Sequence, residues 1–226
     1  MVQMPSDPTG PASERVRVRR QPERAGYDRA TVDAILDAVP IAHLGVVRGG
    51  EPRVLPTTFV RIDDAVFIHG GRQNALLAAA VGQTVCLTVT GLDGLVLARS
   101  AFHHSMNYRS VVVLGVAFEV RAAARKAAVL DRLVERLVPG RAALLRPTRP
   151  GELRATRVLG LPLDEVSAKV RSGPPLDPAA DRSFPVWAGE IPLRQALGRP
   201  RAAPDAPAPA AAPRRIFAGL GVPAPG

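Results

Sequence analysis

The sequence has few of the residues that would stabilise a secreted protein or anchor a membrane protein. Only one of its 226 residues is cysteine, so no disulfide can form within the chain. We expect Cys86, in the alternating segment QTVCLTVT, to be a small core residue. No apolar run approaches the roughly 20 residues that span a bilayer, and the N-terminus lacks the apolar segment of a secretory signal. We therefore expect a cytoplasmic protein with no membrane partner.

Several enzyme motifs are also missing. The chain has no Gly-rich dinucleotide fingerprint, no P-loop, no nucleophile elbow of the G-x-S-x-G type and no Cys/His metal spacing. Its four histidines are not placed four residues apart on a helix, so we expect no zinc site. The formal net charge is +10, but the two ends supply half of it. The remaining basic residues look scattered and lack interleaved aromatics, so we expect no specific nucleic-acid binding.

The chain does contain enough apolar sequence for a sizeable core, since 46% of its residues are hydrophobic. The two ends differ from the middle in composition. Residues 1–26 are polar and contain proline, and residues 198–226 begin with an Ala/Pro tract that cannot continue a helix. We expect both ends to be disordered and residues 27–197 to form one domain.

Within that domain the hydrophobic periodicity switches between the helical and the strand period. Short strands without regular strand–helix alternation favour an antiparallel barrel, a mainly β fold with flanking helices, over a doubly wound parallel sheet. The expected helices cover residues 28–39, 72–81 and 124–140, and the expected strands cover 41–48, 53–62, 65–70, 83–90, 95–100, 109–121, 152–163 and 165–173.

Two of these strands have unusual features. Pro56 lies inside the second strand, where a missing N–H predicts an interrupted ladder with backbone groups free for a ligand. The apolar run from Val111 to Leu114 predicts cover on both faces, and in so short a chain a second subunit would supply it.

The segment IHGGRQNALL has the residues of a phosphate-binding turn. His69 ends a strand, glycines including Gly70 permit close approach of the backbone, and Arg72 and Gln73 open a helix. Free N–H groups at a helix start, together with an arginine fork, favour an anion. The alternative is an ordinary capped helix with a solvated arginine.

The segment AFHHSMNYRSVVVLG, residues 101–115, places six hydrogen-bonding side chains directly before a buried strand. With RVLPTTFVRIDDAVFIHGGRQNALLAAA and LDGLVLARS, it resembles the pyridoxamine 5′-phosphate oxidase-like family of flavin-binding split β-barrels, in particular the branch with the nitroimidazole-resistance proteins. The resemblance extends from about Tyr27 to Leu193. It implies a homodimer with two FMN molecules in clefts at the dimer interface.

The resemblance also implies which residues contact the flavin. Arg53 to Thr58 would run along the ring, Trp187 would cover it, and HHSMNY would be a loop lining the cleft, with His104 as a proton donor to a small-molecule substrate. The implied cofactor-binding residues are Arg53, Pro56, Thr57, Thr58, His69, Gly70, Arg72, Gln73, Ser110 and Trp187.

Two positions depart from the family. Gln73 stands where the family has a phosphate-binding lysine, and Thr58 where the oxidase has a lysine that serves flavin and substrate. We therefore expect a flavin-dependent oxidoreductase that does not oxidise pyridoxamine phosphate. A non-catalytic flavin carrier or sensor remains an alternative. In another, the barrel holds deazaflavin F420 or haem, with His43, His103 or His104 as axial ligand.

Overall fold

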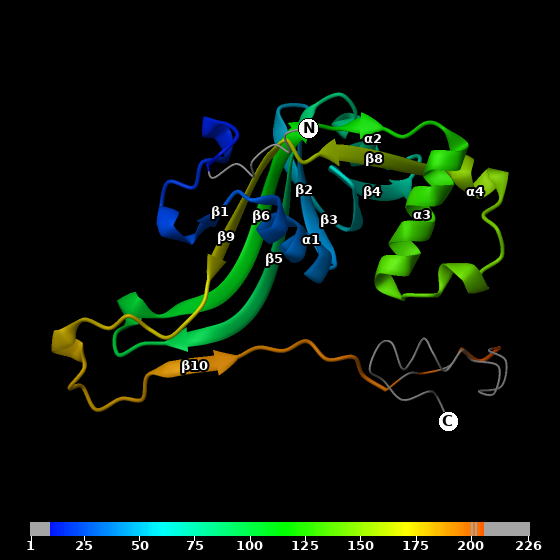
Figure 1. Cartoon of the computed structure of the whole chain (residues 1–226). Coiled ribbons are helices and arrows are strands. Elements are labelled where there is room, and N and C mark those ends of the chain that lie inside the picture. Colours follow the sequence, from blue (N-terminus) through cyan, green and yellow to red (C-terminus); the bar gives the residue numbers. More distant parts are fainter. Residues whose placement is uncertain (1–9, 200, 202, 206–226) are drawn as a thin grey trace, which may run out of the picture.

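The computed structural model describes residues 10–199, 201 and 203–205, and most of its strands follow one antiparallel order (Figure 1). That order is β1-β9-β6-β5-β2-β3-β4-β8-β7, with β10 added beside β5. The strands are β1 (Ala25–Gly26), β2 (Ile41–Arg48), β3 (Glu51–Ile62), β4 (Ala65–Gly71), β5 (Thr84–Leu97), β6 (Ser105–Val116), β7 (Phe118–Glu119), β8 (Thr156–Pro162), β9 (Glu165–Arg171) and β10 (Gly189–Pro192).

Strand β3 joins two halves of this sheet. Its residues Glu51 to Thr58 pair with β2, whereas Phe59 to Ile62 pair with β4. The sheet is therefore split at this strand into one half built on β2, β5, β6 and β9 and a second built on β4, β8 and β7. This is the antiparallel, mainly β architecture expected from the sequence.

The pairing at Pro56 differs from our expectation. Pro56 lies opposite His43 in a ladder that runs without a register shift from Glu51 to Thr58, so the strand is not interrupted. Proline is tolerated because, among the described strands, only β2 pairs with this part of β3.

Helix α1 (Arg29–Ala38) buries Val32, Ile35 and Leu36 in the main core, between the two halves of the sheet. It begins at Asp28, whose carboxylate accepts a hydrogen bond of 2.8 Å from the Thr31 N–H. The expected apolar spacing and N-cap are therefore both present. Helix α2 (Ala75–Ala80) packs Leu77 and Ala80 against the same core.

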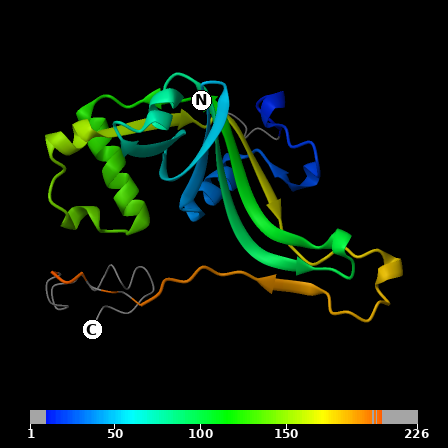
Figure 2. The ribbon, with the colours of Figure 1, turned by 180° about the vertical axis from the view of Figure 1, so that it is seen from behind.

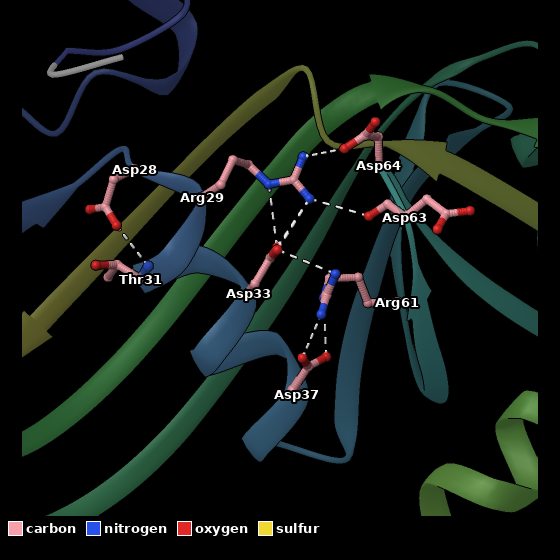
Figure 3. Close-up of polar contacts among 8 residues, drawn as sticks. All are labelled: Asp28, Arg29, Thr31, Asp33, Asp37, Arg61, Asp63 and Asp64. Atoms are coloured by element: carbon pink, nitrogen blue, oxygen red, sulfur yellow. Dashed lines mark hydrogen bonds and ion pairs between the residues drawn. The ribbon is translucent and has the colours of Figure 1, made fainter. Parts of the chain in front are cut away.

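Ion pairs tie α1 to β3 and to the following turn (Figure 3). Arg29 contacts Asp33 on its own helix and Asp64 in the turn, at 3.1 Å and 2.7 Å. Arg61 on β3 reaches Asp37 at 2.6 Å and Asp33 at 3.2 Å. The hydrogen bond with Asp37 raises the pKa of Arg61. These contacts fix the angle at which α1 crosses the strands.

A second core lies between the other sheet half and α3 (Ala123–Leu137). Val129 and Leu133 of α3 pack with Val60, Phe67 and other residues of that half. The chain then forms the 3-10 turn η4 (Ala142–Leu144) and helix α4 (Pro150–Ala155). We expected a strand to begin at residue 152, but Pro150 in the first turn and the bond from the Arg149 N–H to Glu152 start a helix instead, and β8 begins only at Thr156.

Strands β5 and β6 continue well beyond the barrel as a curved arm (Figures 1 and 2). We define the arm as residues 91–109 with the segment 172–193, which includes η5 (Ala179–Asp181) and β10. The hairpin turns through η3 (Ala101–His103), and β10 pairs with residues 94–97 of β5.

The sequence GLDG, which we expected to turn between two strands, lies inside β5. The ladder with β6 shifts register between Leu92 and Gly94, which is a β-bulge and not a turn. A Cβ at Gly94 would lie 3.1 Å from the Ile191 carbonyl oxygen. This glycine therefore permits the close approach of β10, a use of glycine that the sequence pattern cannot separate from a turn.

The N-terminal segment also differs from expectation in its described part. Residues 10–26 form the 3-10 turns η1 (Glu14–Val16) and η2 (Pro22–Arg24), and β1 pairs with β9. Val16 is buried, Ser13 and Arg15 contact Glu165, and Lys169 donates to the Arg20 carbonyl. This segment is ordered because it covers the outer side of β6 and β9. The expectation for residues 198–226 falls mostly outside the described residues.

Candidate functional site

One face of the β2–β3–β5–β6 sheet lies open in the single chain. Register places His43 opposite both Pro56 and Thr88, and Thr88 opposite Val112, so these four side chains share one face. The opposite face points into the core, where Ala42, Val89 and Val111 are buried. We call the residues on the outer side the open face: Ile41, His43, Val54, Pro56, Thr58, Cys86, Thr88, Ser110, Val112 and Leu114.

The open face carries no formally charged side chain and is largely apolar. Ile41 is 41% exposed and Val54 is 66% exposed, and Pro56 is exposed as well. Burial raises the pKa of the Cys86 thiol, which keeps it protonated at neutral pH. An uncharged surface of this kind is typical of a face that another molecule covers. It suits a flat, partly apolar ring or a second copy of the chain.

Three of the ten predicted cofactor residues lie on this face. Pro56 and Thr58 are two positions apart on β3, and Ser110 lies on β6, two positions from Val112. The Ser110 hydroxyl donates to the Lys169 carbonyl at 3.3 Å. The sheet register therefore brings together residues that are more than 50 positions apart in the chain.

Two further predicted residues on β3 point elsewhere. Thr57 lies opposite buried Ala42, on the core side, and its hydroxyl donates to the Thr58 carbonyl at 3.0 Å. Arg53 is paired with Glu51 at the exposed end of the strand. These two side chains are separated from the open face by the alternation of the strand.

His69 lies on β4 beside the point where β3 changes partner. It is opposite Val158 of β8, and its Nδ1 is buried without a hydrogen-bond partner among the described residues. Burial lowers the pKa of His69, so its imidazole is neutral at pH 7. A neutral imidazole with an unpaired buried nitrogen is suited to binding a metal centre or accepting a proton.

The expected phosphate cradle at α2 takes a different form. The Asn74 side chain accepts from the N–H groups of Leu76 and Leu77 at 3.0 Å and 3.2 Å, so these donors are already used. The Arg72 N–H donates to the Ala155 carbonyl at 2.7 Å. The ordinary capped helix, our alternative, describes this helix start. The side chains of Arg72 and Gln73 remain exposed just after β4.

Gly70 supports the helix packing at this point. A Cβ there would lie 2.6 Å from Leu77 Cδ1, so the lack of a side chain lets α2 fold back against β4. The glycine therefore has a packing role, whether or not a ligand passes it.

His104 and Trp187 lie on the arm and not beside the open face. His104 is exposed, and its Nδ1 is 2.8 Å from the Ser100 carbonyl oxygen. It is six positions from Ser110, about 20 Å along a strand. Trp187 is 63% exposed and packs over Gly189. Within one chain neither residue can join the open face.

The segment HHSMNY is mainly strand and not a loop. Only His103 and His104 belong to the turn, whereas Ser105 to Tyr108 lie in β6. Asn107 is buried and donates to Glu190 of β10 at 2.5 Å. Its amide oxygen accepts from Arg171, which also donates to the Gly173 and Pro174 carbonyls at 2.9 Å and 3.1 Å. The polar residues of this segment thus hold the arm together.

Sequence reasoning did not identify Ile41, Val54 and Cys86 as part of a binding face. A signal was present in the strand 41–48, where the outer positions Ile41, His43, Gly45 and Val47 carry no charge. A solvated antiparallel face usually alternates apolar with polar residues, so an uncharged outer row indicates cover.

The family model for pyridoxamine 5′-phosphate oxidase matches residues 28–170, well over half of the chain. The chain therefore belongs to the pyridoxamine 5′-phosphate oxidase family, and its split barrel is the fold of that family. No curated protein matches the chain. In the part of the chain that the structure describes, no helix has the length and hydropathy needed to cross a membrane.

Three solved structures place the chain more narrowly. It is 44% identical to the flavocytochrome Anf3 from Azotobacter vinelandii, over 92% of this chain and 98% of that one, with a TM-score of 0.88. It is 36% identical to the FAD and haem binding protein from Mycobacterium smegmatis, over 87% and 97%, with a TM-score of 0.83. A candidate 5-nitroimidazole resistance protein from Bacteroides thetaiotaomicron, at 19% identity over 65% and 86% and a TM-score of 0.55, shares the fold.

Proposed function

We propose that this chain is a redox protein that binds a flavin and a haem and acts as a homodimer. The observation that carries the proposal is the similarity to the flavocytochrome, which covers 92% of this chain and so extends beyond the family region at residues 28–170. The flavin is FAD in this proposal, in place of the FMN expected from the sequence, because the Mycobacterium smegmatis protein is named for FAD. Neither similar protein is named for F420.

The open face is the surface on which we place the flavin and the second copy of the chain. It is flat, uncharged and bordered by the Thr58 and Ser110 hydroxyl groups, which can hydrogen-bond polar edges of a ring. The Arg72 guanidinium, exposed after β4, is the residue that would pair with a phosphate. When bound, the flavin and the haem supply the electron-transfer chemistry, and the chain binds and orients them.

Among the four histidines, His69 fits a haem iron best. His43 and His104 are exposed, and His103 stacks edge-on against Phe102 at the tip of the arm. His69 combines a lowered pKa with a buried ring nitrogen that lacks a partner. Axial histidines bind iron as the neutral imidazole, and burial keeps His69 in that form.

The arm is the part of the chain that would complete the site in a homodimer. Its exposed apolar residues, which include Phe102 at 88% and Leu176 at 74%, have no cover within the chain. The roles expected for His104 as a proton donor and for Trp187 as a flavin cover require the arm of a second copy. A small-molecule substrate would enter between the arm and the open face.

The test is an absorption spectrum of the purified protein, with light scattering for its mass. We expect a flavin band, a Soret band and the mass of a dimer. His69→Ala should lose the Soret band and keep the flavin band, because it removes the buried imidazole. His43→Ala and His104→Ala, the matched controls, should keep both. A Soret band that survives in His69→Ala would contradict the axial role of His69, and a protein that takes up neither group would contradict the proposed function.

A further inference from the structure

The charge of the chain is concentrated in one part of the fold and is not scattered as its sequence suggested. Residues 121–157, from the end of β7 to the start of β8, hold nine arginines and one lysine against three acidic residues, a formal net charge of +7. The net charge of the whole chain is +10. We call this region the helical lobe; it contains α3, η4 and α4, and it stands at the opposite end of the molecule from the arm (Figure 1).

Some basic residues of the lobe are committed to internal contacts. Buried Lys126 donates to the Leu153 and Thr156 carbonyls at 3.1 Å and 2.7 Å. Arg157 pairs with Glu119 at 3.3 Å. Six arginines are exposed and make no ion pair shorter than 3.8 Å among the described residues: Arg121, Arg125, Arg132, Arg141, Arg149 and Arg154.

Exposed leucines lie among these arginines. Leu137 is 50% exposed, Leu144 is 52% exposed and Leu145 is 45% exposed, at the end of α3 and in η4. An apolar centre with an arginine rim is typical of a protein–protein interface. Residues 121–157 contain no aromatic residue, so the lobe lacks the stacking platform of a single-strand binder. The apolar side of α3 already packs on the sheet through Val129 and Leu133, which leaves little to insert into a membrane.

We propose that the helical lobe docks a small acidic electron-carrier protein. This rests on the proposed redox function, which needs a source of electrons, and the sequence has no fingerprint for a nicotinamide dinucleotide. Electron-transfer complexes have small interfaces and rely on charge to steer their encounter. A basic surface of +7 selects a carrier of opposite sign.

The lobe is connected to the candidate site through β4. The Arg125 guanidinium lies over the Phe67 ring, 5.5 Å from its centroid. Phe67 and His69 are two positions apart on β4, so they lie on the same side of the sheet, the side that α3 covers. A carrier seated on the lobe would therefore stand over the face of the sheet that holds His69.

The experiment measures binding of the purified, cofactor-loaded protein to an immobilised acidic flavodoxin by surface plasmon resonance over a salt series. One variant replaces Arg121, Arg132, Arg141 and Arg154 with glutamine. The matched control replaces four exposed arginines outside the lobe with glutamine: Arg19, Arg20, Arg194 and Arg199. Both variants have the same net charge, so only the position of the lost charge differs.

We expect the lobe variant to associate at least about tenfold more slowly at low salt, and the control to match the wild type within about twofold. The difference should vanish near about 0.5 M salt, where charges are screened. Equal loss in both variants, or no loss in the lobe variant, would overturn the proposal. So would a lobe that binds single-stranded RNA or phosphatidylglycerol vesicles and not flavodoxin.

Absorption spectra of the same samples separate this proposal from the proposed function. Both variants should keep the flavin and Soret bands, because none of the eight arginines touches the open face or His69. A protein without either band that still binds flavodoxin through the lobe would support the docking surface and contradict the redox role.

Discussion

The barrel body and the arm bury different kinds of residue. The largest fully buried side chains of the body are aliphatic or aromatic, among them Phe59, Leu44 and Val113. In the arm and its root the buried set includes Asn107, Arg171 and Asp177, while many of the apolar side chains are exposed. The body therefore folds around its own core, and the arm is held in shape by polar contacts while it presents apolar surface to another molecule.

The largest expected effect is in the body. Val113 is fully buried and lies between Leu87 and Val166 in the sheet. Val113→Asp would bury an unpaired charge and should cost roughly 4 kcal/mol or more, enough to abolish the fold or the dimer. Thermal denaturation followed by circular dichroism tests this. Ala128→Asp, on the exposed side of α3, is the control and should melt within a few degrees of the wild type. A native dimer in Val113→Asp would contradict the placement of this strand.

The next effect is in the polar centre of the arm. Arg171→Met would leave Asn107 Oδ1 and the Gly173 and Pro174 carbonyls without their donor, at a cost of about 2–4 kcal/mol. The loss should stay local, so we expect faster hydrogen exchange in residues 173–193 and little change in the barrel. Arg182→Met, an exposed arginine of the same arm, should exchange like the wild type. Unchanged protection in Arg171→Met would show that β10 is held by its backbone pairing alone.

The smallest effect is a pH dependence confined to the arm. The pKa of Asp177 is lowered by the hydrogen bond from the Arg99 N–H, at 3.0 Å, and by the Arg99 side chain at 2.8 Å. Because the folded pKa lies below the unfolded value near 4, this stabilisation is fully present above about pH 4 and is lost as the pH falls through the folded pKa. Fluorescence of Trp187, in the same segment, should change on acidification below pH 4.

Asp177→Asn should remove that dependence, because the amide still accepts from the Arg99 N–H but does not titrate. Asp181→Asn is the control and should titrate like the wild type. An identical titration in Asp177→Asn would assign the fluorescence change to another group.

The elements with strong local signals could be predicted from the sequence. The range of β2 is the expected one, because a Gly-Gly turn ends it, and α1 differs by two residues at its start and one at its end. Elements that depend on distant partners could not. Strand β10 has four residues and owes its pairing to β5, about 95 positions earlier. Ordering of residues 10–26 likewise depends on contacts with Glu165 and Lys169.

The candidate site followed the same division. The family resemblance pointed to Pro56, Thr58 and Ser110, and the sheet register places them on one face. The free N–H groups expected at α2 are used by Asn74, a competition between side chain and ligand that residue types alone do not decide. The unpaired nitrogen of His69 depends on what surrounds it in three dimensions, so only the fold could reveal it.

The change of partner along β3 has a consequence for solubility. From Glu51 to Thr58 one edge of the strand has no neighbour among the described strands, and such an edge can recruit a strand from another molecule. Pro52 and Pro56 lie along it in an unbroken ladder with β2, so the two N–H groups they lack are ones that would point outward. An incoming strand would find half of its hydrogen-bond donors absent, and the chain can keep this edge uncovered without forming aggregates.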